Sequence, residues 1–154
     1  MATDYTLLAE QTAEFIKDEP FYVPAMANIS ALIWDMLPDL NWAGFYFVRD
    51  NKLVLGPFQG KVACIHIAKG KGVCGTAWDK DETELVPDVH KFPGHIACDS
   101  ASNSEIVVPI HDKATGKVIA VLDIDSPRVS RFNEEDKKGL EKVVKVIESG
   151  ILWN

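Results

Sequence analysis

Hydrophobic residues recur every three to four positions in several segments, which is the period of an α-helix with one buried face. The first such segment ends at Asp18-Glu19-Pro20 and the second stops before Pro38. Near the C-terminus, Asn133-Glu134-Glu135-Asp136 has the composition of a helix start and precedes another hydrophobic stripe. The pattern therefore predicts helices over residues 6–17, 25–37 and 73–80, and a closing helix that begins near residue 133.

Other segments are rich in β-branched and aromatic residues, alternate in polarity and are bounded by turn residues, as strands are. Asp50-Asn51 is a tight-turn signal, and residues 112–116 form a hairpin signal between two such runs. The predicted strands are residues 41–49, 53–56, 62–67, 105–110 and 117–125. Helices that flank hairpin strands indicate the α+β class, and 154 residues without a linker or repeat indicate one domain over residues 1–154.

Strand alternation also predicts which side chains share a face. Trp42 and Tyr46 point to one side of their strand. Asp123 and Asp125 point to one side of another strand, and a spacing of two strand rises places them about 7 Å apart. Glu105 begins the neighbouring strand. If these faces converge, they form a pocket with aromatic walls and three carboxylates. Such a pocket suits a cationic amine with a hydrophobic tail, and crowding of the carboxylates would raise a pKa and provide a proton donor.

Each of these residues also has a structural interpretation that the sequence leaves open. Trp42 and Tyr46 are core aromatics in about two of three such cases. Asp123 and Asp125 would equally suit the solvated edge of a strand.

The three cysteines lie close together in the sequence, between positions 64 and 98. Cys98 lies in a small, polar run, and Cys74 lies in a glycine loop that opens a predicted helix, whose start would lower the pKa of the thiol. Cys64 lies in a short hydrophobic strand and by itself is typical of a small core residue. Cys74 could also be a buried residue of a glycine turn. Redox chemistry at sulfur is the leading hypothesis.

Composition narrows the class of protein further. The formal net charge of −7 argues against a nucleic-acid partner, which would require a basic stripe. No signal peptide and no membrane-length hydrophobic run is visible, and an odd number of cysteines fits a reducing cytoplasm. The histidines are scattered and no C-x-x-C occurs, so a zinc site is a weak alternative. His95 lies three residues before Cys98 and could act as a base there.

Taken in order, eight motifs resemble the GAF-type free methionine-(R)-sulfoxide reductases. The resemblance runs from about residue 5 to residue 148 and includes the set of three cysteines, which ordinary GAF ligand-binding domains lack. The motifs are NWAGFY (41–46), LGPFQG (55–60), AC (63–64), GKGVCGTA (70–77), VPDVH (86–90), GHIACD (94–99), SEIVVP (104–109) and VLDIDSP (121–127).

The resemblance implies a GAF fold with a central antiparallel sheet, a homodimer, free methionine sulfoxide as substrate and thioredoxin as the electron source, with no metal or organic cofactor. It implies that Cys98 attacks the sulfoxide, that Cys64 is the resolving thiol and that Cys74 is an auxiliary partner. The residues that it implies for substrate binding are Trp42, Tyr46, Glu105, Asp123 and Asp125. The helix-start argument alone would favour Cys74 as the nucleophile; we follow the resemblance and assign Cys98.

Two other classes of function remain as alternatives. A GAF-type sensor would bind a small ligand and use its thiols only as a redox switch, but no fused output domain is visible in this chain. A structural metal-binding domain would use the cysteines as ligands, and their spacing disfavours it.

Overall fold

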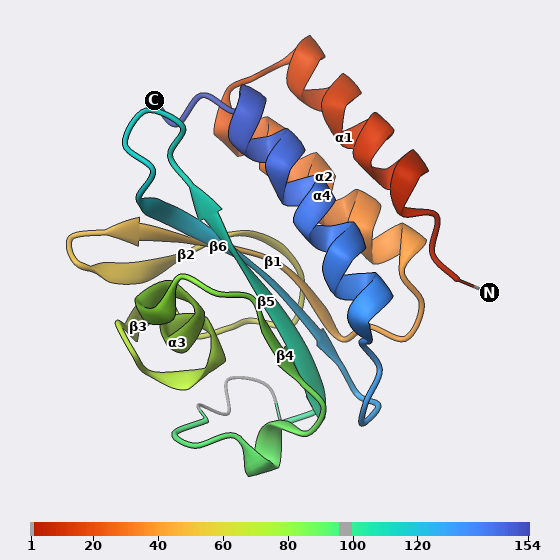
Figure 1. Cartoon of the computed structure of the whole chain (residues 1–154), viewed down its shortest axis with the longest axis vertical. Helices are drawn as coiled ribbons and strands as arrows, with labels where there is room; N and C mark the ends of the chain where they lie inside the picture. Colours follow the sequence, from red (N-terminus) through yellow and green to blue (C-terminus); the bar gives the residue numbers. More distant parts are fainter. Residues whose placement is uncertain (1, 96–99) are drawn as a thin grey trace.

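The core of the molecule is one antiparallel sheet of six strands. The computed structural model describes residues 2–95 and 100–154 and places the strands in the order β3-β2-β1-β6-β5-β4 (Figure 1). The strands are β1 (Trp42–Arg49), β2 (Lys52–Gly60), β3 (His66–Ala68), β4 (Glu84–Val86), β5 (Ser104–His111) and β6 (Val118–Ser126). The predicted α+β class with a central antiparallel sheet is confirmed.

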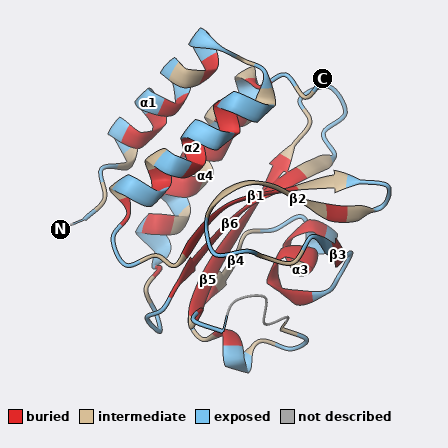
Figure 2. Ribbon diagram, turned by 180° about the vertical axis from the view of Figure 1, so that it is seen from behind, coloured by how far each residue is buried: buried red, intermediate tan, exposed pale blue. Residues whose placement is uncertain are grey.

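Two of the α-helices pack directly on one face of this sheet, a third packs on the outer side of those two, and a fourth lies on the opposite face (Figure 1). The helices are α1 (Tyr5–Asp18), α2 (Tyr22–Met36), α3 (Gly72–Lys80) and α4 (Glu134–Gly150). Figure 2 shows that α2 and α4 turn buried residues toward the sheet, while α1, which contacts α2 and α4, is exposed on its outer side. The helix start predicted at residues 133–136 is confirmed, because Asn133 and Asp136 form a reciprocal capping box.

The sheet has two different faces, as the alternation predicted. Ala43, Phe45 and Leu122 belong to the hydrophobic core beneath α1, α2 and α4. Trp42 and Tyr46, which alternate with them, pack with residues of α3 in a separate, smaller cluster. Side chains on that second face surround the site described below.

Three parts of the sheet differ from the prediction. The strand expected over residues 53–56 is longer, since β2 continues to Gly60. The strand expected over residues 62–67 consists only of His66–Ala68, so Cys64 precedes it in an irregular segment. The hydrophobic residues Val62 and Ile65 are exposed rather than part of the core. The three-residue β4 was not predicted, because it is defined by pairing with β5 and is too short to show a period.

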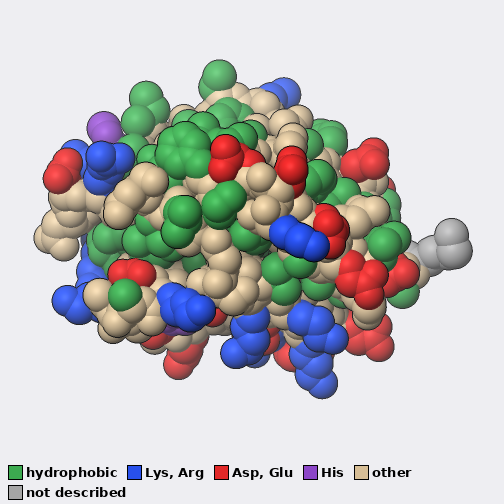
Figure 3. All heavy atoms as spheres, turned by 90° about the horizontal axis from the view of Figure 1, so that it is seen from above, with side chains coloured by type: hydrophobic (Ala, Val, Ile, Leu, Met, Phe, Trp, Pro, Cys, Tyr) green, Lys and Arg blue, Asp and Glu red, His purple; other side chains and the backbone are tan. Residues whose placement is uncertain are grey.

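The surface carries charges of both signs. The face drawn in Figure 3, seen from above the view of Figure 1, shows hydrophobic side chains in its middle and interspersed acidic and basic side chains around them. That face has no continuous basic stripe of the kind that a phosphate backbone requires. Within the described part of the chain, no helix is both long enough and hydrophobic enough to cross a bilayer.

Candidate active site

The three predicted carboxylates converge because of the register of neighbouring strands. Asp125 of β6 is paired with Trp42 of β1 on one side and with Glu105 of β5 on the other. Two residues earlier in β6, Asp123 is paired with Gly44. Side chains at positions two apart in a strand project from the same face, so Asp123 and Asp125 face the same space as Trp42 and Glu105. The predicted convergence is confirmed.

An aromatic wall closes one side of this space. The Trp42 ring is stacked on Tyr46, with centroids 5.8 Å apart, and on Phe58, with centroids 5.0 Å apart. Gly44 permits this arrangement, because a Cβ at that position would lie 2.3 Å from Cβ of Phe58. The Trp42 indole Nε1 donates to the carbonyl of Lys61 at 3.2 Å, and the Tyr46 hydroxyl donates to the carbonyl of Cys64 at 2.9 Å.

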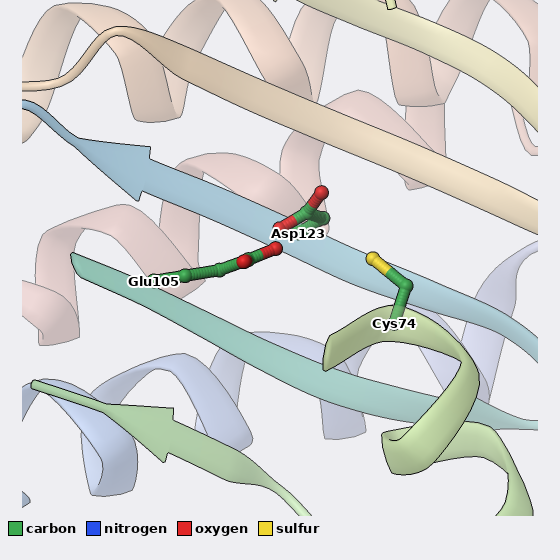
Figure 4. A group of neighbouring side chains, drawn as sticks. All are labelled: Cys74, Glu105 and Asp123. Atoms are coloured by element: carbon green, nitrogen blue, oxygen red, sulfur yellow. The ribbon is translucent and has the colours of Figure 1, made fainter. Parts of the chain in front are cut away.

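The carboxylates themselves are buried. Glu105, Asp123 and Asp125 are only 6%, 5% and 9% exposed, so the solvated-edge interpretation of the two aspartates is wrong. Figure 4 shows Glu105 of β5, Asp123 of β6 and Cys74 of α3 turned toward one another. One carboxylate oxygen of each acid and the Sγ atom of Cys74 lie within 4.8 Å of one another. The Oδ1 atom of Asp123 is buried and has no hydrogen-bond partner among the described residues.

Burial and mutual repulsion determine how these groups hold protons. The pKa of Glu105 is raised well above its ordinary value by burial and by the nearby charges of Asp123 and Asp125. Burial also raises the pKa of Asp123, although hydrogen bonds with Glu105, Cys74 and Asp125 act in the opposite direction. Burial and the neighbouring aspartates therefore favour the neutral form of Glu105, which can then donate a hydrogen bond to Asp123 or Asp125.

Cys74 does not have the reactive environment that its position at a helix start suggested. It lies in the first turn of α3, but it is a free cysteine and only 4% exposed. Burial raises the pKa of its thiol, and so do the nearby charges of Asp123, Glu105 and Asp125. The prediction of a lowered pKa is wrong, because burial first, and then the three carboxylates on β5 and β6, outweigh the first turn of one short helix. The alternative of a buried cysteine is correct, although Cys74 lies in a helix rather than in a glycine turn.

Cys64 has a different state and environment. It is half-buried, lies between β2 and β3, and takes part in a disulfide. It packs only partly against the smaller hydrophobic cluster, so it is not a simple core residue. Cys98, predicted to be the nucleophile, lies outside the described residues.

A cavity opens among these groups, lined by Trp42, Tyr46, Ala63, Ile67, Lys71, Gly72, Val73, Cys74, His95, Ser102, Glu105, Asp123 and Asp125. Its volume is about 40 Å³, which is room for about three or four water molecules. Lys71 and Ser102 were not predicted as lining residues, because they are common polar residues in loops with no distinguishing pattern. His95 also lines the cavity, and burial together with His90 lowers its pKa, which favours the neutral imidazole of a general base.

The buried groups offer two kinds of chemistry. A thiol and two carboxyl groups within 4.8 Å could hold a divalent metal ion, which the sequence spacing did not suggest. The same carboxylates, beside a stacked aromatic wall, could bind an ammonium group whose ligand also carries a small hydrophobic end.

Comparison with protein families gives one match over most of the chain. The GAF domain family matches residues 25–151. The free methionine-R-sulfoxide reductase of Escherichia coli is 52% identical to the chain over 130 residues, which are 84% of this chain and 78% of that protein.

Solved structures give the same picture. The structure of fRMsr of Staphylococcus aureus in complex with substrate has a TM-score of 0.92 and 51% identity, and the match covers 99% of this chain and 98% of that one. The free methionine-R-sulfoxide reductase from Neisseria meningitidis in complex with its substrate has a TM-score of 0.90 and 41% identity, with 97% and 91% covered.

Proposed function

We propose, because the chain belongs to the GAF domain family and within it to the free methionine-R-sulfoxide reductases, that it reduces free L-methionine-(R)-sulfoxide to L-methionine. The observation that carries the proposal is the buried carboxylate group beside an aromatic wall in a small cavity. Buried carboxylates of like charge are costly, and a cationic ligand would offset that cost.

Substrate binding uses the two ends of this cavity. Asp123 and Asp125 accept hydrogen bonds from the α-ammonium of the free amino acid, and the unpartnered Oδ1 of Asp123 supports this role. Trp42 and Tyr46 hold the methyl group at the sulfoxide end through contacts with their rings. A peptide-bound methionine sulfoxide has no ammonium at this position, so the site selects the free amino acid.

Glu105 supplies the proton in this mechanism. Its raised pKa favours the neutral form, and a neutral carboxyl group can donate a proton to the sulfoxide oxygen as the S–O bond breaks. Asp123, held by its contacts with Glu105 and Cys74, orients the acid and remains an acceptor. Cys74 is thus a positioning residue, because its thiol is buried among carboxylates and resists ionisation.

The sulfur chemistry requires two thiols. The Cys98 thiolate, with His95 as its base, attacks the sulfoxide sulfur and forms a sulfur–sulfur bond. The sulfoxide oxygen, protonated by Glu105, is transferred to the Cys98 sulfur as that bond breaks, so methionine leaves and Cys98 becomes a sulfenic acid. The Cys64 thiol then attacks the sulfenic sulfur, which releases water and forms a Cys64–Cys98 disulfide. The sum is one sulfoxide and two thiols converted to one thioether, one disulfide and one water. The disulfide at Cys64 and the free state of Cys74 support this division.

Thioredoxin reduces the disulfide by thiol–disulfide exchange, and the mechanism uses no metal or organic cofactor. We place the enzyme in the cytoplasm, where such reductants keep thiols reduced. The proposed assembly is a homodimer, for which exposed Phe21, Val23 and Leu152 offer a hydrophobic surface. We take residues 1–154 as one domain, since Leu8 and Ile16 of α1, ahead of the matched residues 25–151, belong to the core.

The test is a coupled assay with purified protein, methionine-(R)-sulfoxide, thioredoxin, thioredoxin reductase and NADPH. Consumption of NADPH with equal release of methionine supports the reductase. Saturable binding of the sulfoxide without turnover would instead support a sensor. A stoichiometric metal in the isolated protein, lost together with its folding on chelation, would support a metal-binding domain at Cys74, Glu105 and Asp123.

A further inference from the structure

The segment that carries Cys64 exposes two large hydrophobic side chains beside the disulfide. Val62 is 88% exposed and Ile65 is 61% exposed, more than any other large hydrophobic residue described. They lie two positions before and one position after half-buried Cys64. Single exposed hydrophobic residues are ordinary, but this pair lies where a reductant must reach a sulfur atom.

The backbone of this segment is held in place while these side chains face outward. The carbonyl of Lys61 accepts from the Trp42 indole at 3.2 Å, and the carbonyl of Cys64 accepts from the Tyr46 hydroxyl at 2.9 Å. The carbonyl of Ile65 accepts from the backbone N–H of Leu55 at 2.9 Å. The exposure of Val62 and Ile65 is therefore a property of an anchored segment, and binding a partner there would require little further ordering.

The region around the segment is basic in an otherwise acidic chain. Residues 51–78 contain four lysines and no Asp or Glu, although the whole chain has a net charge of −7. Lys61 is exposed beside Val62; exposed Lys71 lines the same cavity as Ala63. Within residues 2–95 and 100–154, neither lysine forms an ion pair. This charge is complementary to a partner with an acidic surface.

We propose that Val62 and Ile65, with Lys61 at their edge, form the docking surface for a protein dithiol reductant. The attacking thiol of this reductant lies in a hydrophobic surface with acidic residues at its edge. This rests on the proposed function, which requires the disulfide to be reduced. A mixed disulfide brings two sulfur atoms to about 2.05 Å, so any protein that forms one with half-buried Cys64 must cover the neighbouring side chains.

The exchange step balances without another reactant. A thiolate of the reductant attacks Sγ of Cys64, the Cys64–Cys98 bond breaks, and the electron pair leaves on Cys98 as a thiolate. The second thiol of the reductant then attacks the mixed disulfide and releases Cys64. The reductant leaves as a disulfide, and the nucleophilic thiolate of Cys98 is restored for the next turnover.

The test compares two reductants on the same variants. Val62→Ser and Ile65→Ser, and the double variant, are assayed with thioredoxin and separately with dithiothreitol. We expect kcat/KM for thioredoxin to fall about tenfold or more in the double variant, while dithiothreitol-driven turnover stays unchanged. Lys61→Glu should lower kcat/KM for thioredoxin further and weaken its dependence on salt. The matched control is Val129→Ser, an exposed valine outside this segment, which should change neither.

Three outcomes would overturn the docking surface: wild-type kcat/KM for thioredoxin in the double variant, an equal loss with both reductants, or a change in oligomeric state, which would assign the surface to contact between copies. Release of about one methionine per subunit in a single turnover without reductant tests the proposed function separately. It should be the same in the wild type and the double variant, and its absence from the wild type would contradict the reductase itself.

Discussion

The two faces of β6 are made by alternate residues of one strand and have opposite properties. Leu122 and Ile124 are fully buried in the core beneath α1, α2 and α4, where hydrophobic side chains fill the space. Asp123 and Asp125 are nearly as buried, but they face a cavity together with Glu105 and Cys74. Burial alone therefore does not distinguish the faces; the chemistry of the buried groups does.

This difference separates the residues that stabilise the fold from those that serve the reaction. The hydrophobic face gains free energy from burial at every position. On the opposite face, burial raises the pKa values of Glu105 and Asp123, so the empty site is less stable than a hydrophobic one of the same shape would be. We interpret the cost of this face as the cost of a ligand-binding site, and substitutions on each of the two faces test this interpretation.

The largest expected effect is at the thiols. Cys98→Ser should lower the rate of the first turnover by at least about a thousandfold, because the nucleophile is removed. Cys64→Ser should release about one methionine per subunit and then stop, because no disulfide forms for the reductant. Rapid-quench measurement of methionine with no reductant present distinguishes these variants.

Cys74→Ser is the internal control for that experiment. Its thiol is buried among carboxylates and has a raised pKa, so the first turnover should still occur. If Cys74→Ser lost the burst of methionine while Cys98→Ser kept it, the assignment of the nucleophile would be wrong.

The next largest effect compares neighbouring residues on opposite faces of β6. Asp123→Asn should lower kcat/KM at least about a hundredfold with no loss of thermal stability, because it changes the polar face only. Leu122→Ala should cost about 2–5 kcal/mol of stability and leave kcat/KM within about threefold, since it opens a cavity in the core. Glu105→Gln and Asp125→Asn should behave like Asp123→Asn. Wild-type kcat/KM in all three amide variants would contradict the carboxylate site.

The smallest effect is on the pH dependence of stability. The folded-state pKa of Glu105 is raised above its ordinary value of 4.5, so its favourable contribution is complete below pH 4.5 and is lost as pH rises toward the folded-state pKa. Glu105→Gln does not titrate. The variant's Tm should therefore exceed that of the wild type by more at pH 8 than at pH 5, by calorimetry. A Tm difference that does not change with pH would mean that Glu105 ionises freely in the folded protein.

Much of the arrangement could be predicted from the sequence where a short period determines it. Alternation over residues 42–47 and 121–125 placed Trp42, Tyr46, Asp123 and Asp125 on one side of the sheet, and the register with β5 brought Glu105 to them. Because successive side chains of a strand point to opposite faces, identifying the hydrophobic face also identifies the residues of the other face. The capping sequence at Asn133 located the start of α4 for a similarly local reason.

Features that depend on long-range neighbours could not be predicted. The pKa of Cys74 was predicted from its own helix, but its direction is determined by burial and by carboxylates 31 to 51 positions away in the sequence. Val62 and Ile65 have the composition of a core strand, yet hydrogen bonds from Trp42, Tyr46 and Leu55 hold their segment at the surface. The short strand β4 exists only through its pairing with β5.

The most direct test of the central claim is the ratio of kcat/KM for free methionine-(R)-sulfoxide to that for its N-acetyl derivative. Acetylation removes the ammonium charge, and a charge-assisted hydrogen bond of this kind contributes about 1.5–3 kcal/mol, with a further cost for the carboxylates left unpaired. We expect the free amino acid to be favoured at least about a hundredfold, and the (S) epimer to be inactive. Equal values of kcat/KM for the free and acetylated substrates would contradict recognition of the amine by Asp123 and Asp125.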